Sequence, residues 1–295
     1  THLNAGVRFN YLEKFQKQIW EPRLSFNHKF LQWFNLEVLG EFKHQNTSQV
    51  INFQNDFLGI EKRRWQLTND SDIPIIQSKQ GSLGLSYERS NWLVNVVGFL
   101  KEVDGITTQS QGFLDRYELI RTSGRYDADG MDLLIRKQFR NGNTWVSYGY
   151  LSSKYRFDNL PEPVFQSNFD ITHTISSGIT YHLKKFHFAA GINWRTGKPY
   201  TAPLAGNEII DSEINYAEAN SSRLSDYLRV DISAIYKSQI SGKTGLRAGI
   251  SFWNLLNREN PINTFYRVNA QGGPQQIVQR SLGITPNATL KLLFN

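Results

Sequence analysis

The strongest constraint on this chain is a two-residue alternation of apolar and polar side chains. Near the C-terminal end, the even-numbered positions are mostly apolar: Leu282, Ile284, Ala288, Leu290, Leu292 and Phe294. The odd-numbered positions between them are polar or small: Ser281, Gly283, Thr285, Asn287, Thr289 and Lys291. Successive side chains of a strand point to opposite faces of a sheet. This segment is therefore predicted to be a strand with one face in hydrocarbon and the other in water.

The same alternation recurs along the chain and predicts about twelve strands of about ten residues each. The predicted strands cover residues 2–11, 20–27, 34–43, 82–87, 92–101, 129–139, 144–155, 173–183, 186–195, 227–237, 246–255 and 281–294. Several polar positions on these strands carry charges: Glu37, Glu41, Lys43, Arg229, Asp231 and Arg247. Charges on that side predict a water-filled lumen. The expected fold class is all-β, and the expected architecture is a transmembrane antiparallel β-barrel.

The segments that join these strands are alternately short and long. The short ones are predicted to be tight turns: 31–32, 89–91, 141–143, 184–185 and the slightly longer 238–244. The long ones are polar: 46–80, 102–128, 156–172, 196–226 and 257–280. In an up-and-down barrel, this alternation places the turns at one end and the long loops at the other. A β-sandwich gives no reason for so strict a succession.

The composition agrees with a membrane barrel and disfavours several other classes. The 295 residues are 39% hydrophobic and 13% aromatic, and aromatic rings anchor barrels at both membrane interfaces. The mean hydropathy is −0.46, and no stretch approaches the roughly 18 apolar residues of a membrane helix. The absence of cysteine suits a chain that crosses an oxidising compartment. The net charge of +7 comes from scattered Lys and Arg residues, which disfavours nucleic-acid binding.

The motifs that could bind a nucleotide or a metal are weak. Residues 195–199 end in Pro199, where a phosphate-binding loop needs Ser or Thr. The six histidines lack the i, i+4 spacing of a helical zinc site. The carboxylates of Asp127, Asp129 and Asp132 do not fit a calcium loop, which requires a terminal Glu. We therefore expect neither a metal nor a bound cofactor.

One neighbourhood suggests an enzyme, because barrels can carry a Ser and His pair on their outer surface. It consists of His173 with Ser176 or Ser177. No orienting Asp or Asn is identifiable from the sequence, and Ser is common on barrel strands. We expect no enzyme activity.

Two long loops carry the residue types of a ligand site, namely aromatic rings with amides and carboxylates. The candidates in the first loop are Trp65, Asn69, Asp70 and Asp72. The candidates in the second loop are Tyr200, Glu208, Asp211 and Glu213. Both loops are expected at the same end of the barrel, where a ligand would arrive.

Several segments resemble TonB-dependent outer-membrane receptors, and the resemblance spans nearly the whole chain. These segments are 20–23, 74–81, 105–113, 195–201 and 253–261. The last of them has the pattern aromatic-Asn-Leu-x-Asn-Arg-x-Asn-Pro, which recurs in receptors with unrelated cargo. The resemblance therefore indicates the family and leaves the ligand open.

The resemblance implies the C-terminal part of a plugged barrel of about twenty-two strands. Residues 1–295 would form a single, incomplete domain, with the plug, about ten earlier strands and the segment that binds TonB outside this sequence. Such a receptor of the Gram-negative outer membrane imports a scarce nutrient, such as a ferric siderophore, cobalamin, a peptide or a glycan, with energy supplied through TonB. Its partners would be the missing strands and plug, the TonB complex, outer-membrane lipid and, as a further candidate, a surface lipoprotein.

The resemblance also assigns roles to two groups of residues. The charges on the lumen side would contact the plug. The apolar residues of the last strand would resemble the aromatic-ended signal that the barrel-assembly machinery reads: Leu290, Leu292 and Phe294. Asn295 departs from that signal, because the family usually ends on the aromatic residue itself.

Two other classes stay open on the sequence. A self-contained porin or barrel enzyme of about twelve strands would need no earlier strands. A secreted β-rich binding module would have no membrane contact and would dissolve without detergent.

Overall fold

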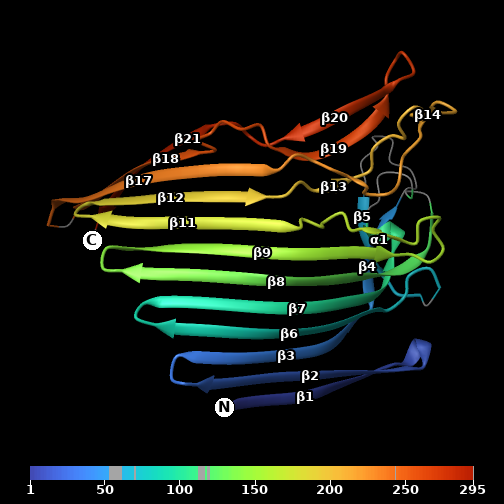
Figure 1. Ribbon diagram of the computed structural model, residues 1–295, viewed down its shortest axis with the longest axis horizontal. Coiled ribbons are helices and arrows are strands. Elements are labelled where there is room, and N and C mark those ends of the chain that lie inside the picture. Colours follow the sequence, from blue (N-terminus) through green and yellow to red (C-terminus); the bar gives the residue numbers. More distant parts are fainter. Residues whose placement is uncertain (53–61, 70, 112–116, 118–119, 243, 295) are drawn as a thin grey trace.

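The computed structural model describes residues 1–52, 62–69, 71–111, 117, 120–242 and 244–294. Its dominant element is a thirteen-stranded sheet in which all neighbouring strands are antiparallel (Figure 1). Twelve of its strands follow one another in chain order: β1 (His2–Leu12), β2 (Lys17–Phe30), β3 (Phe34–Gln45), β6 (Ile76–Arg89), β7 (Trp92–Thr107), β8 (Ser123–Phe139), β9 (Gly142–Arg156), β11 (His173–Leu183), β12 (Phe186–Arg195), β17 (Tyr227–Ser241), β18 (Thr244–Trp253) and β21 (Thr285–Phe294).

The remaining elements are short and lie mostly in the long connections. They are β4 (Thr47–Asn52) with β5 (Lys62–Leu67), β10 (Val164–Gln166) beside β9, β13 (Pro199–Tyr200) with β16 (Ser222–Arg223), β14 (Ile209–Ile210) with β15 (Glu213–Ile214), β19 (Pro261–Val268) with β20 (Pro274–Arg280), the 3-10 turn η1 (Glu13–Phe15) and the helix α1 (Thr108–Gln111). No helix among the described residues is long and apolar enough to cross a membrane.

Every predicted strand is present, so the expectation of about twelve strands is confirmed. Several predicted boundaries are wrong. The strand expected at 82–87 begins at Ile76, and the strand expected at 129–139 begins at Ser123. The last strand begins only at Thr285, so Leu282 and Ile284 precede it. The long connections are also not plain loops, because they contain the β4–β5 and β19–β20 hairpins.

The strand register divides the sheet into one apolar face and one polar face. Paired residues share a face, and one row of partners on the apolar face runs from β3 to β17: Leu36, Leu85, Val96, Leu133, Tyr148, Ile175, Trp194 and Leu228. Side chains on this face stay exposed, with Leu100 at 69% and Phe294 at 77%. An apolar face of this extent on a sheet is suited to contact with lipid.

The tight turns have the geometry that matches the twist of antiparallel strands. Leu31 and Gln32 between β2 and β3 have φ of 47° and 62°, and Ser90 and Asn91 between β6 and β7 have φ of 48° and 65°. Two successive residues with positive φ make a type I′ hairpin turn. The turns lie at one end of the strands and the long connections at the other (Figure 1).

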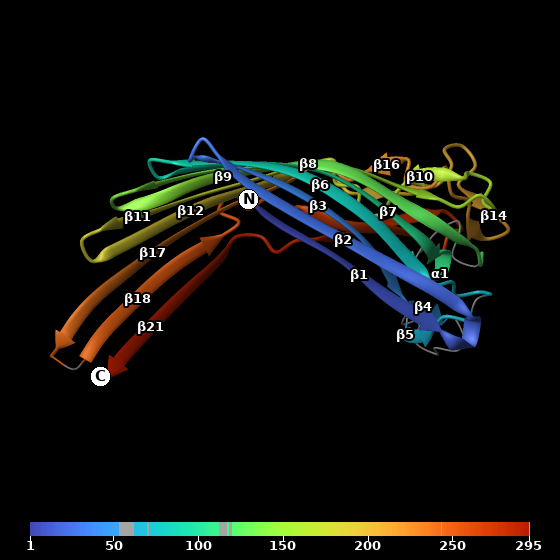
Figure 2. The ribbon, with the colours of Figure 1, turned by 90° about the horizontal axis from the view of Figure 1, so that it is seen from below.

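The sheet is curved and open at both edges. Figure 2 shows it as an arch whose two ends curl to the same side. Within the described residues, β1 pairs only with β2, and β21 pairs only with β18. A strand edge in a membrane must be paired, because lipid offers no hydrogen-bond partners.

The buried core lies at the loop end rather than within the sheet. Its members are Ile106, Tyr117, Tyr155, Phe157, Leu160, Phe165 and Ala219. They come from the ends of β7 and β9 and from three of the long connections. This cluster fixes the loops against the polar face, since Val103 and Tyr126 of that face pack against it.

Candidate functional site

A group of cations and aromatic rings lies where β12, β17 and β18 meet the long loops. We call it the basic–aromatic patch and define it by Arg195, Lys198, Tyr200, Tyr227, Arg229, Trp253 and Tyr266. The guanidinium of Arg195 lies over the Tyr227 ring at 4.7 Å, and that of Arg229 lies over the Trp253 ring at 5.9 Å. Arg195 is paired with Tyr227 in the register, and Asn193 is paired with Arg229. These contacts hold both guanidinium groups on the polar face.

The loop side of the patch is formed by Lys198 and two tyrosines. Lys198 donates a hydrogen bond to the Oδ1 of Asn263 at 3.2 Å. Burial, together with the nearby charge of Arg195, lowers the pKa of Lys198. The Tyr200 ring stacks on Tyr266 at 6.4 Å. Burial, and the hydrogen bond with Tyr200, raise the pKa of Tyr266 to about 12. The phenol of Tyr266 is therefore a neutral hydrogen-bonding group at physiological pH.

A network of asparagines positions this patch. Asp231 accepts hydrogen bonds from the Nη2 of Arg229 at 2.6 Å and from the backbone N–H of Asn254 at 2.9 Å. The buried amide of Asn254 donates to the carbonyls of Arg258 and Leu282, both at 2.9 Å. The network therefore joins β17, β18 and the segment before β21. It accounts for Asn254 of the 253–261 motif, whose role was not evident from sequence.

An ion pair between the exposed Arg223 and the buried Asp170 supports the loop next to Lys198. Arg223 donates to the backbone carbonyl of Asp170 at 2.7 Å, to the Oδ2 of Asp170 at 3.0 Å and to the carbonyl of Gly197 at 3.1 Å. The Asp170 side chain is only 3% exposed. Burial raises the pKa of Asp170, although the charge of Arg223 opposes this shift. Arg223 thus ties two loops together across the β13–β16 hairpin.

The six charges expected on the lumen side all lie on the polar face by register. Arg229 pairs with Asp231, and Lys43 pairs with Glu41 at 2.5 Å. Glu37 and Arg247 make no hydrogen bond or ion pair within the described part of the chain. A contact of these six residues with a plug stays a prediction.

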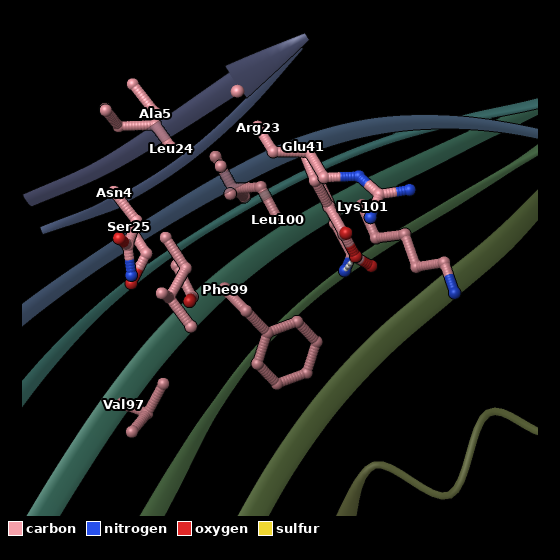
Figure 3. A pocket seen from close by; sticks show the side chains of 16 residues that line it. Asn4, Ala5, Arg23, Leu24, Ser25, Glu41, Val97, Phe99, Leu100 and Lys101 are labelled. Carbon is pink, nitrogen blue, oxygen red and sulfur yellow. Dashed lines mark hydrogen bonds between the residues drawn. The ribbon is translucent and has the colours of Figure 1, made fainter. Parts of the chain in front are cut away.

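A hollow of about 700 Å³ lies on the polar face across β1, β2, β3, β6 and β7 (Figure 3). One row of partners forms its charged side: Arg23, Glu41, Gln80 and Lys101. Leu39, Val97 and Phe99 form its apolar side. Apolar side chains on this face break the alternation, so the sequence pattern did not predict the hollow.

The candidates in the first loop either stabilise their own turn or are exposed to solvent. The Oδ1 of Asn69 accepts hydrogen bonds from the backbone N–H groups of Ser71, Asp72 and Ile73. Trp65 lies on β5 and is exposed, and Asp72 is also exposed. Asp70 lies outside the described residues.

The second loop candidates are divided between the patch and a hairpin tip. Tyr200 belongs to the basic–aromatic patch. Glu208, Asp211 and Glu213 lie on the β14–β15 hairpin, where Asp211 occupies a turn position with φ of 49°. Hydrogen bonds from backbone N–H groups, that of Gly206 foremost, lower the pKa of Glu208. No hydrogen bond, ion pair or ring contact joins the first and second sets among the described residues, and their role in ligand binding stays a prediction.

The assembly residues lie as an alternating strand requires. Leu290, Leu292 and Phe294 lie on the apolar face of β21, opposite Ala248, Leu246 and Thr244. Asn295 lies outside the described residues.

The neighbourhood of His173 does not form a catalytic pair. The Tyr148 hydroxyl lies 2.9 Å from the Nδ1 of His173. Ser176 donates to Asn193 at 3.0 Å, and Ser177 donates to the carbonyl of Trp145 at 3.0 Å. Both hydroxyls therefore donate hydrogen bonds to residues of neighbouring strands rather than to His173.

Comparisons with known proteins place this architecture. No protein-family model matches the chain. No curated protein matches it significantly. Solved structures do match in fold. The ferric citrate transporter FecA in its unliganded form has a TM-score of 0.63 and 11% sequence identity over 94% of this chain and 38% of FecA.

Two further structures give the same picture. The ferric yersiniabactin uptake receptor FyuA from Yersinia pestis has a TM-score of 0.61 and 12% identity over 94% of this chain and 37% of FyuA. The outer-membrane transporter YddB from Escherichia coli has a TM-score of 0.61 and 12% identity over 98% of this chain and 43% of YddB. This chain thus spans less than half the length of each of these proteins. In its fold, it matches part of the β-barrel of TonB-dependent outer-membrane receptors.

Proposed function

We propose that this chain is part of an outer-membrane receptor that imports a scarce nutrient through a plugged barrel with energy from TonB. The observation that carries the proposal is the basic–aromatic patch at the loop end of the polar face, in a sheet with the fold of receptor barrels. In such a barrel the apolar face contacts outer-membrane lipid and the polar face lines the lumen. A ligand that arrives from the loop side meets the patch before it meets the lumen.

Among ferric siderophores, cobalamin, peptides and glycans, the patch favours an anionic iron chelate. Arg195 and Lys198 supply positive charge, and Arg229 lies beside them in an ion pair with Asp231. Guanidinium groups bind carboxylates and other anionic oxygens in a bidentate manner. The rings of Tyr227 and Trp253 hold these guanidinium groups in place. FecA and FyuA, which share the fold, carry ferric citrate and ferric yersiniabactin according to their names.

The polar face also supports contact with a plug. Glu37 and Arg247 have no partner within the described residues, so each is available to an opposite charge. The hollow beside Phe99 offers apolar surface with a charged rim (Figure 3). We place the plug against these residues, and we assign the TonB complex and a surface lipoprotein as partners of the complete receptor.

A binding experiment on the complete receptor in detergent tests the ligand class. Ferric citrate and a ferric catecholate serve as anionic probes, and cyanocobalamin serves as a neutral one. We expect an anionic probe to bind, and Arg195→Gln to weaken its binding about tenfold, which corresponds to about 1.4 kcal/mol. Lys237→Gln, at the turn end of β17, is the matched control and should bind normally. Equal binding by Arg195→Gln, or binding of cyanocobalamin alone, would contradict the anionic ligand.

A further inference from the structure

Two cations interrupt the apolar face at the turn end of the sheet. They belong to one row of register partners on β6, β7 and β8: Arg89, Trp92 and Lys137. The next row towards the loops on the same face is uncharged: Tyr87, Val94 and Ile135. From that row to the turns, Arg89 and Lys137 are the only charged residues that the described strands place on this face. The apolar face therefore gives way to positive charge at this row.

The spacing between these cations and the charges at the loop end equals one membrane crossing. Lys79, Glu102 and Asp127 form a row of register partners on the same face of the same three strands. On each strand, nine residues separate this row from the row of the two cations: 80–88, 93–101 and 128–136. A barrel strand spans the hydrocarbon with about 9–11 residues. The cations therefore lie at headgroup level in the leaflet at the turn end, which faces the periplasm in outer-membrane barrels.

Each cation lies against a tryptophan ring. The guanidinium of Arg89 lies 4.8 Å from the ring centroid of Trp33 in the β2–β3 turn, and the ammonium of Lys137 lies 4.8 Å from that of Trp92. Both turns lie at the same end of the sheet (Figure 1). Lys137 also donates a hydrogen bond to the carbonyl of Ser90 at 2.9 Å. Because Ser90 follows Arg89 in the chain, this bond draws the second cation towards the turn that carries the first.

No carboxylate neutralises these cations among the described residues. Neither Arg89 nor Lys137 makes an ion pair there. The adjacent Glu88 lies on the polar face, because its register partner is Leu93. At the loop end, by contrast, the apolar face carries both signs of charge. Like charges on neighbouring strands repel each other, and an anion bound between them would remove this repulsion.

A series of aromatic rings leads across the apolar face to the two cations. Consecutive ring centroids lie 6.2, 6.2, 5.5 and 5.0 Å apart in the order Phe26, His28, Phe30, Phe34 and Tyr87. Tyr87 precedes Arg89 by two residues and shares its face. Aromatic rings concentrate at membrane interfaces. The series therefore supports the headgroup level of the cations and supplies a surface for acyl chains beside them.

We propose that Arg89 and Lys137 bind the phosphate of one anionic phospholipid from the leaflet at the turn end, with its acyl chains over Tyr87 and Val94. A guanidinium and an ammonium both donate charge-assisted hydrogen bonds to phosphate oxygens. A zwitterionic headgroup would also bring an ammonium, for which the site offers no carboxylate. The site therefore favours a headgroup with a net negative charge, such as phosphatidylglycerol. The inference rests on the proposed membrane location of the barrel and is independent of the nutrient that the receptor imports.

Native mass spectrometry of the complete receptor tests this site, after release from nanodiscs that contain equal amounts of phosphatidylglycerol and phosphatidylethanolamine. We expect one phosphatidylglycerol molecule to stay bound in preference to phosphatidylethanolamine. Arg89→Gln and Lys137→Gln should each lower its retention about fivefold, and Lys137→Arg should retain it because the charge is kept. Arg136→Gln is the matched control, since Arg136 adjoins Lys137 but lies on the polar face opposite Leu93.

Three outcomes would overturn the lipid site. These are equal retention of the two lipids by the wild type, unchanged retention by both Gln variants of the site, and an equal loss in Arg136→Gln. Ferric citrate binding is measured on the same samples. Loss of the lipid preference with normal ferric citrate binding would refute the lipid site alone. A retained lipid preference without ferric citrate binding would support the lipid site and contradict the proposed anionic ligand.

Discussion

Asn260 and Leu228 are joined by a reciprocal pair of hydrogen bonds. The side-chain amide of Asn260 donates to the carbonyl of Leu228 at 2.9 Å, and the Oδ1 of Asn260 accepts from the N–H of Leu228, also at 2.9 Å. Asn260 is fully buried. A side chain from the connection between β18 and β21 thus continues the hydrogen bonding of β17 at its loop end, just beside Arg229.

Replacing this asparagine should destabilise the loop end of the barrel. Asn260→Ala removes both bonds and leaves the Leu228 backbone groups unsatisfied, so we expect a loss of roughly 1–3 kcal/mol in the free energy of unfolding. Chemical unfolding of the complete receptor measures this loss. Asn207→Ala, whose side chain is exposed and makes no bond in the described residues, is the matched control. Equal stability of the two variants would contradict the structural role of Asn260.

The buried carboxyl of Asp170 should make stability depend on pH. Its pKa is raised in the folded protein, chiefly by burial. Folding therefore favours the protonated form of Asp170. This contribution to stability is fully present below the pKa of the unfolded chain and is lost as pH rises through the raised pKa of the folded protein. As pH rises across this acidic range, the melting temperature of the complete receptor should fall less steeply for Asp170→Asn than for the wild type. Asp158→Asn, an exposed carboxyl on the same loop, should follow the wild type.

Binding of an anionic ligand should weaken at alkaline pH. Burial and Arg195 lower the pKa of Lys198, so this lysine loses its charge at a lower pH than an ordinary lysine does. Affinity for ferric citrate should fall as pH rises through this lowered pKa. Lys198→Met should bind more weakly throughout and should lose this part of the pH dependence, which titration calorimetry measures. A pH profile of Lys198→Met identical to that of Lys237→Met would count against the assignment.

The last strand offers a matched pair of neighbouring residues for a test of assembly. Phe294 lies on the apolar face and is 77% exposed, whereas Leu293 lies on the polar face opposite Gly245. Phe294→Ala should lower the yield of folded barrel in membranes several-fold, and Leu293→Ala should leave it near normal. Heat-modifiable mobility on gels separates folded from unfolded protein. Equal yields would remove Phe294 from the assembly signal.

Spin labels along β17 test the assignment of the two faces. Labels at even positions from Leu228 to Tyr236 should be accessible to oxygen dissolved in lipid, and labels at odd positions should be accessible to an aqueous nickel complex. The alternation follows from the register, in which Leu228 and Val230 lie on the apolar face and Arg229 and Asp231 lie on the polar face. A profile without alternation would mean that β17 does not cross a bilayer.

The sequence predicted the strands well where one side chain in two meets lipid. It failed where strands rise above the membrane, because the outward positions there are no longer apolar. Lys79 on β6 and Asp127 on β8 lie on the apolar face yet are charged, so β6 and β8 were predicted to begin too late. The extended strand ends follow from backbone pairing, which hydrophobic periodicity does not report.

The candidate site was less predictable, since it depends on contacts between distant segments. Tyr200 was selected for its loop, but its partner Tyr266 comes from the β19 strand and has no periodic signal. Arg195 was considered as part of a weak phosphate-loop motif, of the receptor-like segment 195–201 and of the predicted strand 186–195. None of these indicated its contact with Tyr227 across the sheet. The acidic residues at the β14–β15 tip were predicted to bind a ligand from their residue types alone. Pairing across the sheet, rather than composition, brings the basic–aromatic patch together.

The separation of short turns and long connections onto opposite ends gives membrane insertion a direction. The loop-end segments carry many charges, among them Arg223 and Asp170, and all of them must be translocated through the bilayer during assembly. The turns, such as Leu31–Gln32, can stay on the side of entry. Each hairpin must therefore enter loop end first, and the bulk of the folded loop cluster around Phe157 requires that it form only after translocation.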